Sequence, residues 1–219
     1  MKKKAIIAVV ALVLVLCCAM GGTLAWLVDS TTEVKNTFTY GDINISLWEH
    51  KLNDDGLTLS TDVFTDAEQT GFKMIPGNNI EKDPTVTVKE GSEACWLFVE
   101  VKESENFDDF MTYAIAEGWT LYDTGTTGSN IDTVTNKDYV IYREVTALDK
   151  AQEFNVLKDN TVTVKNTVTK QMLNALDKNE DGSDKTESEK TYPTLTFTAY
   201  AVQKDGFNTA ALAWAEINK

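Results

Sequence analysis

The amino-acid sequence predicts a mainly β protein, an antiparallel β-sandwich with a few short helices. Short runs of β-branched and aromatic residues alternate with threonine and other polar residues, which is the period of a half-buried strand. Residues that favour turns separate these runs. Many short strands joined by turns are typical of an antiparallel sandwich rather than of βαβ units.

Eight segments have the pattern of a strand. The last of them, 194–202, alternates most regularly. The runs at 119–122 and 139–144 flank a loop rich in Thr, Gly, Asn and Asp, and we expect them to form a long hairpin. The predicted strands are 36–40, 43–47, 85–89, 96–101, 119–122, 139–144, 160–169 and 194–202.

Three segments have helical features. The stretch 105–117 places Phe107, Phe110, Met111, Ala114 and Ile115 on one stripe, between Asn106 and Gly118, and so predicts an amphipathic helix. The stretches 169–176 and 208–217 predict two shorter helices, the second capped by Asn208. Residues 177–190 include no apolar side chain and predict an exposed acidic loop.

The N-terminus has the order of a secretory signal peptide. Three lysines at 2–4 precede the apolar run 5–20, a Gly pair and the triplet Thr23-Leu24-Ala25. Small residues at 23 and 25 suit cleavage between Ala25 and Trp26. We therefore divide the chain into a signal peptide, 1–25, and a single sandwich domain, 26–219.

Two other interpretations of this segment stay open. If it is not cut, residues 5–28 are long enough to anchor the chain in a bilayer. A lipid anchor on Cys17 is disfavoured because the bulky Leu16 precedes it. Each interpretation exports the rest of the chain, so we expect a secreted protein of the extracellular matrix or cell surface.

The charge argues against nucleic acid as a partner. The chain has 34 acidic and 20 basic residues. Residues 1–25 carry three lysines and no acid, so the remainder has 17 basic residues and a net charge of −17. Such a surface repels phosphate, and we expect membrane contact only through an uncleaved signal segment.

The sequence predicts no catalytic residue and no enzyme. It has one histidine, His50, which is too few for a zinc site of histidine ligands. The triplet Asp123-Thr-Gly125 resembles an aspartic-protease motif, but it has no second copy to form a dyad. Cys95 is the only cysteine after the export segment. We expect it to be a small buried apolar residue, with an intermolecular disulfide as the alternative.

One loop has part of a calcium-binding pattern. Asp177, Asn179 and Asp181 occupy positions 1, 3 and 5 of an EF-hand loop, and Gly182 occupies position 6. Position 12 is Ser188 in place of the usual glutamate. The loop is therefore either a polar hairpin or a weak extracellular Ca²⁺ site, and we expect no other cofactor.

Several motifs resemble one known family. They are Gly21–Asp29 with Asn36–Ile45, then Ile75-Pro76-Gly77, Lys82-Asp83-Pro84, the strand 96–101, Asp138–Tyr142, and Tyr200–Gln203 with Gly206-Phe207. In this order they resemble the TasA/camelysin (CalY) family of exported Gram-positive proteins, which a signal peptidase of the SipW type processes. The resemblance runs through most of the chain, although the inner loops and residues 177–190 depart from TasA.

The resemblance implies a jelly-roll-like sandwich that assembles into fibres of the biofilm matrix. Cleavage would free residues 26–35, an extended segment in which Trp26, Leu27, Val28 and Val34 are apolar. We expect it to add as a donor strand to another copy, giving a head-to-tail homopolymer. Folding back onto its own sheet is the alternative. A camelysin-like metallopeptidase and a monomeric cell-surface binding sandwich are the other functions considered.

Overall fold

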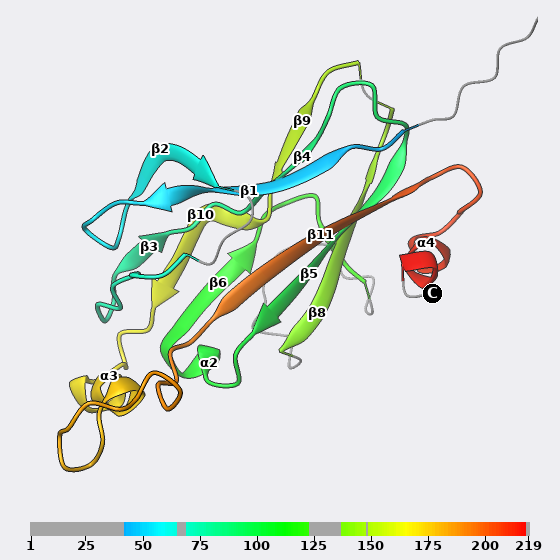
Figure 1. Cartoon of the computed structure of the whole chain (residues 1–219). Coiled ribbons are helices and arrows are strands. Elements are labelled where there is room, and N and C mark those ends of the chain that lie inside the picture. The colour runs from blue at the N-terminus through cyan, green and yellow to red at the C-terminus, as the bar shows by residue number, and fades with distance from the viewer. Residues whose placement is uncertain (1–41, 65–68, 123–136, 148, 218–219) are drawn as a thin grey trace, which may run out of the picture. The chain divides into compact units, whose positions relative to one another are not determined.

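Antiparallel sheets form the framework of the structure, a computed structural model (Figure 1). It describes residues 42–64, 69–122, 137–147 and 149–217, which belong to one compact unit, Gly41–Lys219. The signal segment, the predicted strand 36–40 and the Asp123-Thr-Gly125 triplet lie outside the described residues. The mainly β, antiparallel sandwich that the alternating pattern predicts is confirmed, and a jelly-roll strand order stays a prediction.

The described strands form three sheets. Within each sheet, strands that are hydrogen-bonded to one another follow one another in the order given. The first sheet is β2 (Leu59–Phe64), β1 (Ile45–Leu52), β4 (Thr85–Val88) and β9 (Gln152–Asn155). The second is β3 (Asn79–Glu81), β10 (Leu157–Val164) and β6 (Met111–Ile115). The third is β11 (Leu195–Gln203), β5 (Cys95–Glu103), β8 (Asp138–Val145) and β7 (Thr120–Leu121). The helices are α2 (Phe107–Phe110), α3 (Lys170–Asp177) and α4 (Ala210–Ile217).

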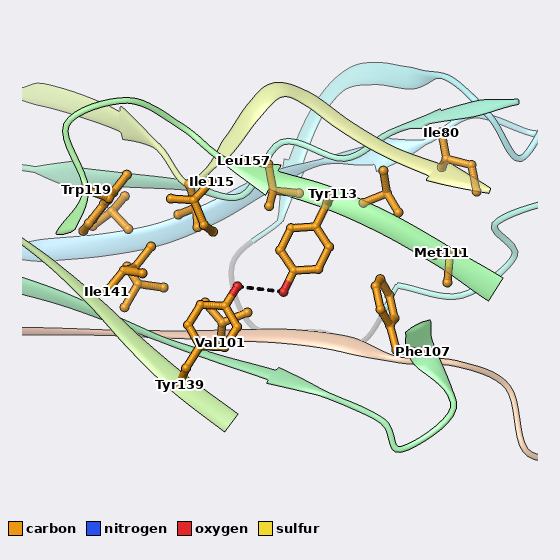
Figure 2. Packing of buried hydrophobic residues seen from close by; sticks show 14 of the residues in the cluster. Ile80, Val101, Phe107, Met111, Tyr113, Ile115, Trp119, Tyr139, Ile141 and Leu157 are labelled. Atoms are coloured by element: carbon orange, nitrogen blue, oxygen red, sulfur yellow. Dashed lines mark hydrogen bonds between the residues drawn. The ribbon is translucent and has the colours of Figure 1, made fainter. Parts of the chain in front are cut away.

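The central strand β5 divides its apolar side chains between two clusters. Leu97, Val99 and Val101 belong to the main core, and Figure 2 shows Val101 on the opposite side of this core from Tyr113 of β6 and Leu157 of β10. Phe98, on the opposite face, packs against α4 through Ala213 and Trp214. Because both faces of β5 are covered, the strand is a continuous apolar run rather than an alternating one.

Most of the predicted strands are confirmed, with ends that differ by up to three residues, except that the C-terminal ends of β1 and β10 differ by five. The strands β1, β4, β5, β10 and β11 match predictions, and β7 pairs with β8 as the predicted hairpin. The sequence analysis did not predict β2, β3 and β9. These are short strands with few buried side chains, so their apolar pattern is weak.

The predicted helix at 105–117 is wrong. Only Phe107–Phe110 are helical, and Met111–Ile115 form strand β6. Met111, Tyr113 and Ile115 alternate inward, with period two, and β6 pairs with β10. The same apolar residues fit a helical stripe, so the pairing partner decides between the two forms.

The two shorter predicted helices are confirmed. Thr169 caps α3, since its hydroxyl accepts a hydrogen bond from the Met172 N–H at 3.2 Å. In α4 the residue that does this is Thr209, which accepts from Leu212 at 3.3 Å, and not the predicted Asn208. The described residues contain no helix that is long and apolar enough to cross a membrane.

Candidate assembly surface

Strand β11 lies at the edge of its sheet and pairs only with β5 among the described strands. Thr194 and Lys204 make their backbone hydrogen bonds toward the β5 side, to Ser104 and Ala94. In an antiparallel ladder the pairing direction alternates from residue to residue. The odd-numbered residues of β11 therefore direct their N–H and C=O groups away from β5. These residues are Leu195, Phe197, Ala199, Ala201 and Gln203.

Strand β1 offers a second unpaired stretch close to β11. It contacts β11, yet no backbone pairing joins the two strands. The Asn44 carbonyl accepts a hydrogen bond from the Lys89 N–H, so the backbone groups of residue 44 are directed toward β4. Because the direction alternates from residue to residue, the backbone groups of Ile45 and Leu47 are directed away from β4. Strand β2 covers that side of β1 only from Glu49 onward. We call these two unpaired edges, Ile45 and Leu47 with Leu195–Ala201, the β1–β11 seam.

The apolar side chains along the β1–β11 seam are only partly buried. Each packs against the main core while keeping part of its surface exposed, in contrast to the fully buried residues of β5. An added strand would cover this surface and satisfy the backbone groups at the same time. The partly buried residues are Ile45, Leu47, Leu195, Phe197, Ala199 and Ala201.

A shielded ion pair lies beside the seam. The ammonium of Lys82 contacts both carboxylate oxygens of Glu49 at 2.9 Å, and the two side chains are only 14% and 13% exposed. The same ammonium lies 5.7 Å from the ring centroid of Phe197 and 5.4 Å from that of Phe72. This contact ties β1 to β11 through side chains at the place where no backbone ladder does.

The predicted donor segment and cleavage site belong to the part of the chain that the structure does not describe. Ala25, Trp26, Leu27, Val28 and Val34 lie outside the described residues. The described chain begins at Asp42, whose carbonyl accepts a hydrogen bond from Glu93 at 3.0 Å. Asp42 is therefore bonded to Glu93, the neighbour of Ala94, whose carbonyl accepts a hydrogen bond from Lys204 directly after β11.

The candidate calcium residues lie in an exposed turn after α3. Asp177 ends the helix and accepts a hydrogen bond from Tyr192 at 3.4 Å. Asn179 donates to Ser183, and one Asp181 oxygen accepts from both the N–H and the hydroxyl of Ser183. These bonds to Ser183 hold the pKa of Asp181 below its ordinary value.

The acidic segment 177–190 is held by internal pairs. Asp184 pairs with Lys178, and Glu187 pairs with Lys190. Most of its side chains are exposed, as the sequence predicts. No group of three or more His, Cys, Asp or Glu side chains is placed to hold a metal ion within the described part of the chain. A weak Ca²⁺ site at Asp177, Asn179 and Asp181 remains untested.

His50 and Cys95 both have structural surroundings. His50 Nδ1 lies 2.5 Å from Oδ2 of the buried Asp83, whose other oxygen accepts the His50 backbone N–H at 3.0 Å. The Trp48 ring packs edge-on against the imidazole at 5.1 Å. Cys95 is fully buried, which confirms the interpretation as a small apolar residue.

Comparison with known proteins does not indicate a function, so the proposed function depends on the geometry. The chain matched no protein-family model, no curated protein sequence and no solved structure. The seam itself was not predicted from the sequence, because which strand forms an edge depends on the strand order. The regular alternation of 194–202 was the one signal that pointed to β11.

Proposed function

We propose that this protein is a secreted structural subunit of extracellular fibres, which assembles after signal-peptide cleavage when residues 26–35 of one copy add as a strand to another. The observation that carries the proposal is the edge of β11, which spans nine residues, has no partner among the described strands on its outer side and carries partly buried apolar side chains. Edges of this kind template pairing with another chain unless they are blocked.

The edge of β11 has few of the features that block such pairing. Lysine, proline and short length are the usual protections of an edge strand. Residues 195–203 contain no proline and no charged side chain. In the donor segment 26–35, Trp26, Val28 and Val34 stand at even positions, so an extended strand would place them on the same face when it adds to a half-buried sheet.

The first test removes the donor segment. The mature chain, residues 26–219, and a form lacking Trp26–Lys35 would be compared by sedimentation at low and high salt. We expect the mature chain to sediment as filaments, more strongly at high salt or with a divalent cation, because these screen the net charge of −17. The truncated form should stay a folded monomer. Filaments that form equally well without the segment would reject strand donation.

The second test blocks the acceptor edge. The Ala199 N–H points away from β5, so Ala199→Pro removes a donor that the described sheet does not use. We expect a folded protein that no longer extends filaments. Ala199→Ser keeps the N–H and serves as the matched control, which should assemble like the parent. Monodisperse particles from the unmodified mature chain would favour instead a monomeric cell-surface binding sandwich.

A further inference from the structure

Arg143, the only arginine of the chain, lies between two aromatic rings. Arg143 belongs to β8 and lies opposite Leu97 of the neighbouring strand β5. Its side chain is therefore on the inner face of the sheet, at the end of the sandwich where β7 begins. The guanidinium carbon lies 4.0 Å from the ring centroid of Phe154 and 5.3 Å from that of Trp119. The rings therefore desolvate the cation while they hold it in place.

This cation has no counter-ion in the part of the chain that the structure describes. None of the ion pairs there includes Arg143, and its Nε is buried without a hydrogen-bond partner. Burial lowers the pKa of Arg143. A desolvated charge without a partner lowers the stability of the folded protein. The chain has 34 carboxylate side chains that could pair with this cation.

Gly118 leaves room at the end of the guanidinium. A Cβ at this position would lie 3.1 Å from one terminal nitrogen and 3.4 Å from the other. The glycine thus keeps side-chain atoms away from the two nitrogens with which an arginine binds a carboxylate in its own plane. The positive φ of +87° at Gly118 further disfavours any other residue there. Arg143 as a whole is half-buried.

A free carboxylate is presented at the opposite end of the unit. Figure 2 places Trp119 at one end of the core and Phe107 of α2 at the other, and Figure 1 shows α3 and the loop that follows it at the α2 end. In that loop Glu180 is exposed, at the tip of a turn that the Gly182 N–H closes to the Asn179 carbonyl at 2.9 Å. Glu180 makes no hydrogen bond or ion pair with another described residue, whereas the nearby carboxylates of 181–189 are bonded within the loop.

We propose that Arg143 is a carboxylate-binding site and that its ligand is Glu180 of a second copy. The inference rests on the proposed fibre function, because two sites at opposite ends of one unit give a head-to-tail contact that does not close. The contact would add a salt-sensitive, geometrically specific bond to the strand-donation contact.

The decisive test introduces a reactive amine at position 143. Mature Arg143→Lys, mixed in equal amounts from normal and ¹⁵N-labelled preparations, would be treated with a carbodiimide that joins amines to carboxylates without a spacer. Mass spectrometry of the digest should find position 143 joined to Glu180, with one peptide from each isotope. Coupling to another carboxylate, coupling within one copy, or no coupling would overturn the proposal.

A second measurement uses variants in the exposed loop, where folding is not at risk. Glu180→Gln should raise the critical concentration for filament formation about tenfold at low salt, and less at high salt. Glu187→Gln, on the same loop but paired with Lys190, is the matched control and should change it little. If Glu180→Gln assembles like the parent, this contact is wrong while strand donation stands. If the parent forms no filament and the coupled peptide is still found, the site is right and the fibre function is wrong.

Discussion

The hydroxyl oxygens of Tyr113 and Tyr139 lie 2.8 Å apart in the core (Figure 2), and the Tyr113 hydroxyl donates to Oε1 of Glu103 at 2.7 Å. Since Tyr113 uses its proton for Glu103, the Tyr139 hydroxyl is the donor between the two tyrosines. Lys137 reaches the other Glu103 oxygen at 3.3 Å. The network joins β5, β6 and β8 across the two layers and satisfies a carboxylate that is only 3% exposed.

The two tyrosines of this network should differ in their effect on stability. Tyr113→Phe removes a hydrogen bond to a buried carboxylate and leaves the Tyr139 hydroxyl without an acceptor, so we expect a loss of about 2–3 kcal/mol. Tyr139→Phe removes only a bond between neutral groups and should cost about 1 kcal/mol. Urea denaturation measures both. An equal or reversed order would show that Tyr113 is not the donor to Glu103.

The same tyrosines predict a loss of stability at alkaline pH. Burial, first of all, raises the pKa of Tyr113 and of Tyr139 far above the ordinary value of 10.0. The unfolded chain therefore releases these protons first. Their contribution is complete below about pH 10 and falls above it by about 1.4 kcal/mol per pH unit for each tyrosine.

Denaturation midpoints between pH 9 and 11 would measure this slope. Tyr113→Phe should flatten it by the share of one tyrosine. Tyr192→Phe is the matched control, because Tyr192 is 49% exposed. If the two variants have equal slopes, the alkaline loss has another source.

Cys95 should be unreactive in the native protein. Its side chain is fully buried, and burial raises the pKa of its thiol to about 11, so little thiolate forms at neutral pH. An aromatic disulfide reagent should label it very slowly in buffer and at once in denaturant. Rapid native labelling, or a disulfide-linked dimer without reducing agent, would restore the intermolecular disulfide as an explanation.

His50 should matter for stability and not for catalysis. His50→Ala removes the side-chain partner of the buried Asp83 carboxylate, and we expect a loss of about 1–3 kcal/mol. Asp83 would keep only the bond from the residue-50 backbone. Peptide hydrolysis should be undetectable in both proteins, with or without a chelator. Chelator-sensitive cleavage that is lost in His50→Ala would instead support the metallopeptidase alternative.

The local pattern of the sequence was sufficient for the elements that carry their own signal. Residues 194–202 alternate so regularly that strand β11 follows from them alone. The stretch 169–176 likewise predicts helix α3, whereas its cap at Thr169 was seen only in the structure. The apolar run 96–101, interrupted only by Glu100, also predicts β5, because a strand with both faces covered has few polar side chains.

Tertiary structure decided the features that depend on contacts between segments distant in the chain. Residues 107–115 fit a helical stripe and a strand equally well, and pairing with β10 made 111–115 a strand. Strand order left one side of β11 without a partner among the described strands. Arg143 is an ordinary charged residue in the sequence; only the approach of Phe154 and Trp119, from other strands and loops, makes it a desolvated cation. Periodicity reports how one segment buries its side chains, whereas edges, ion pairs and desolvation arise between segments that are distant in the chain.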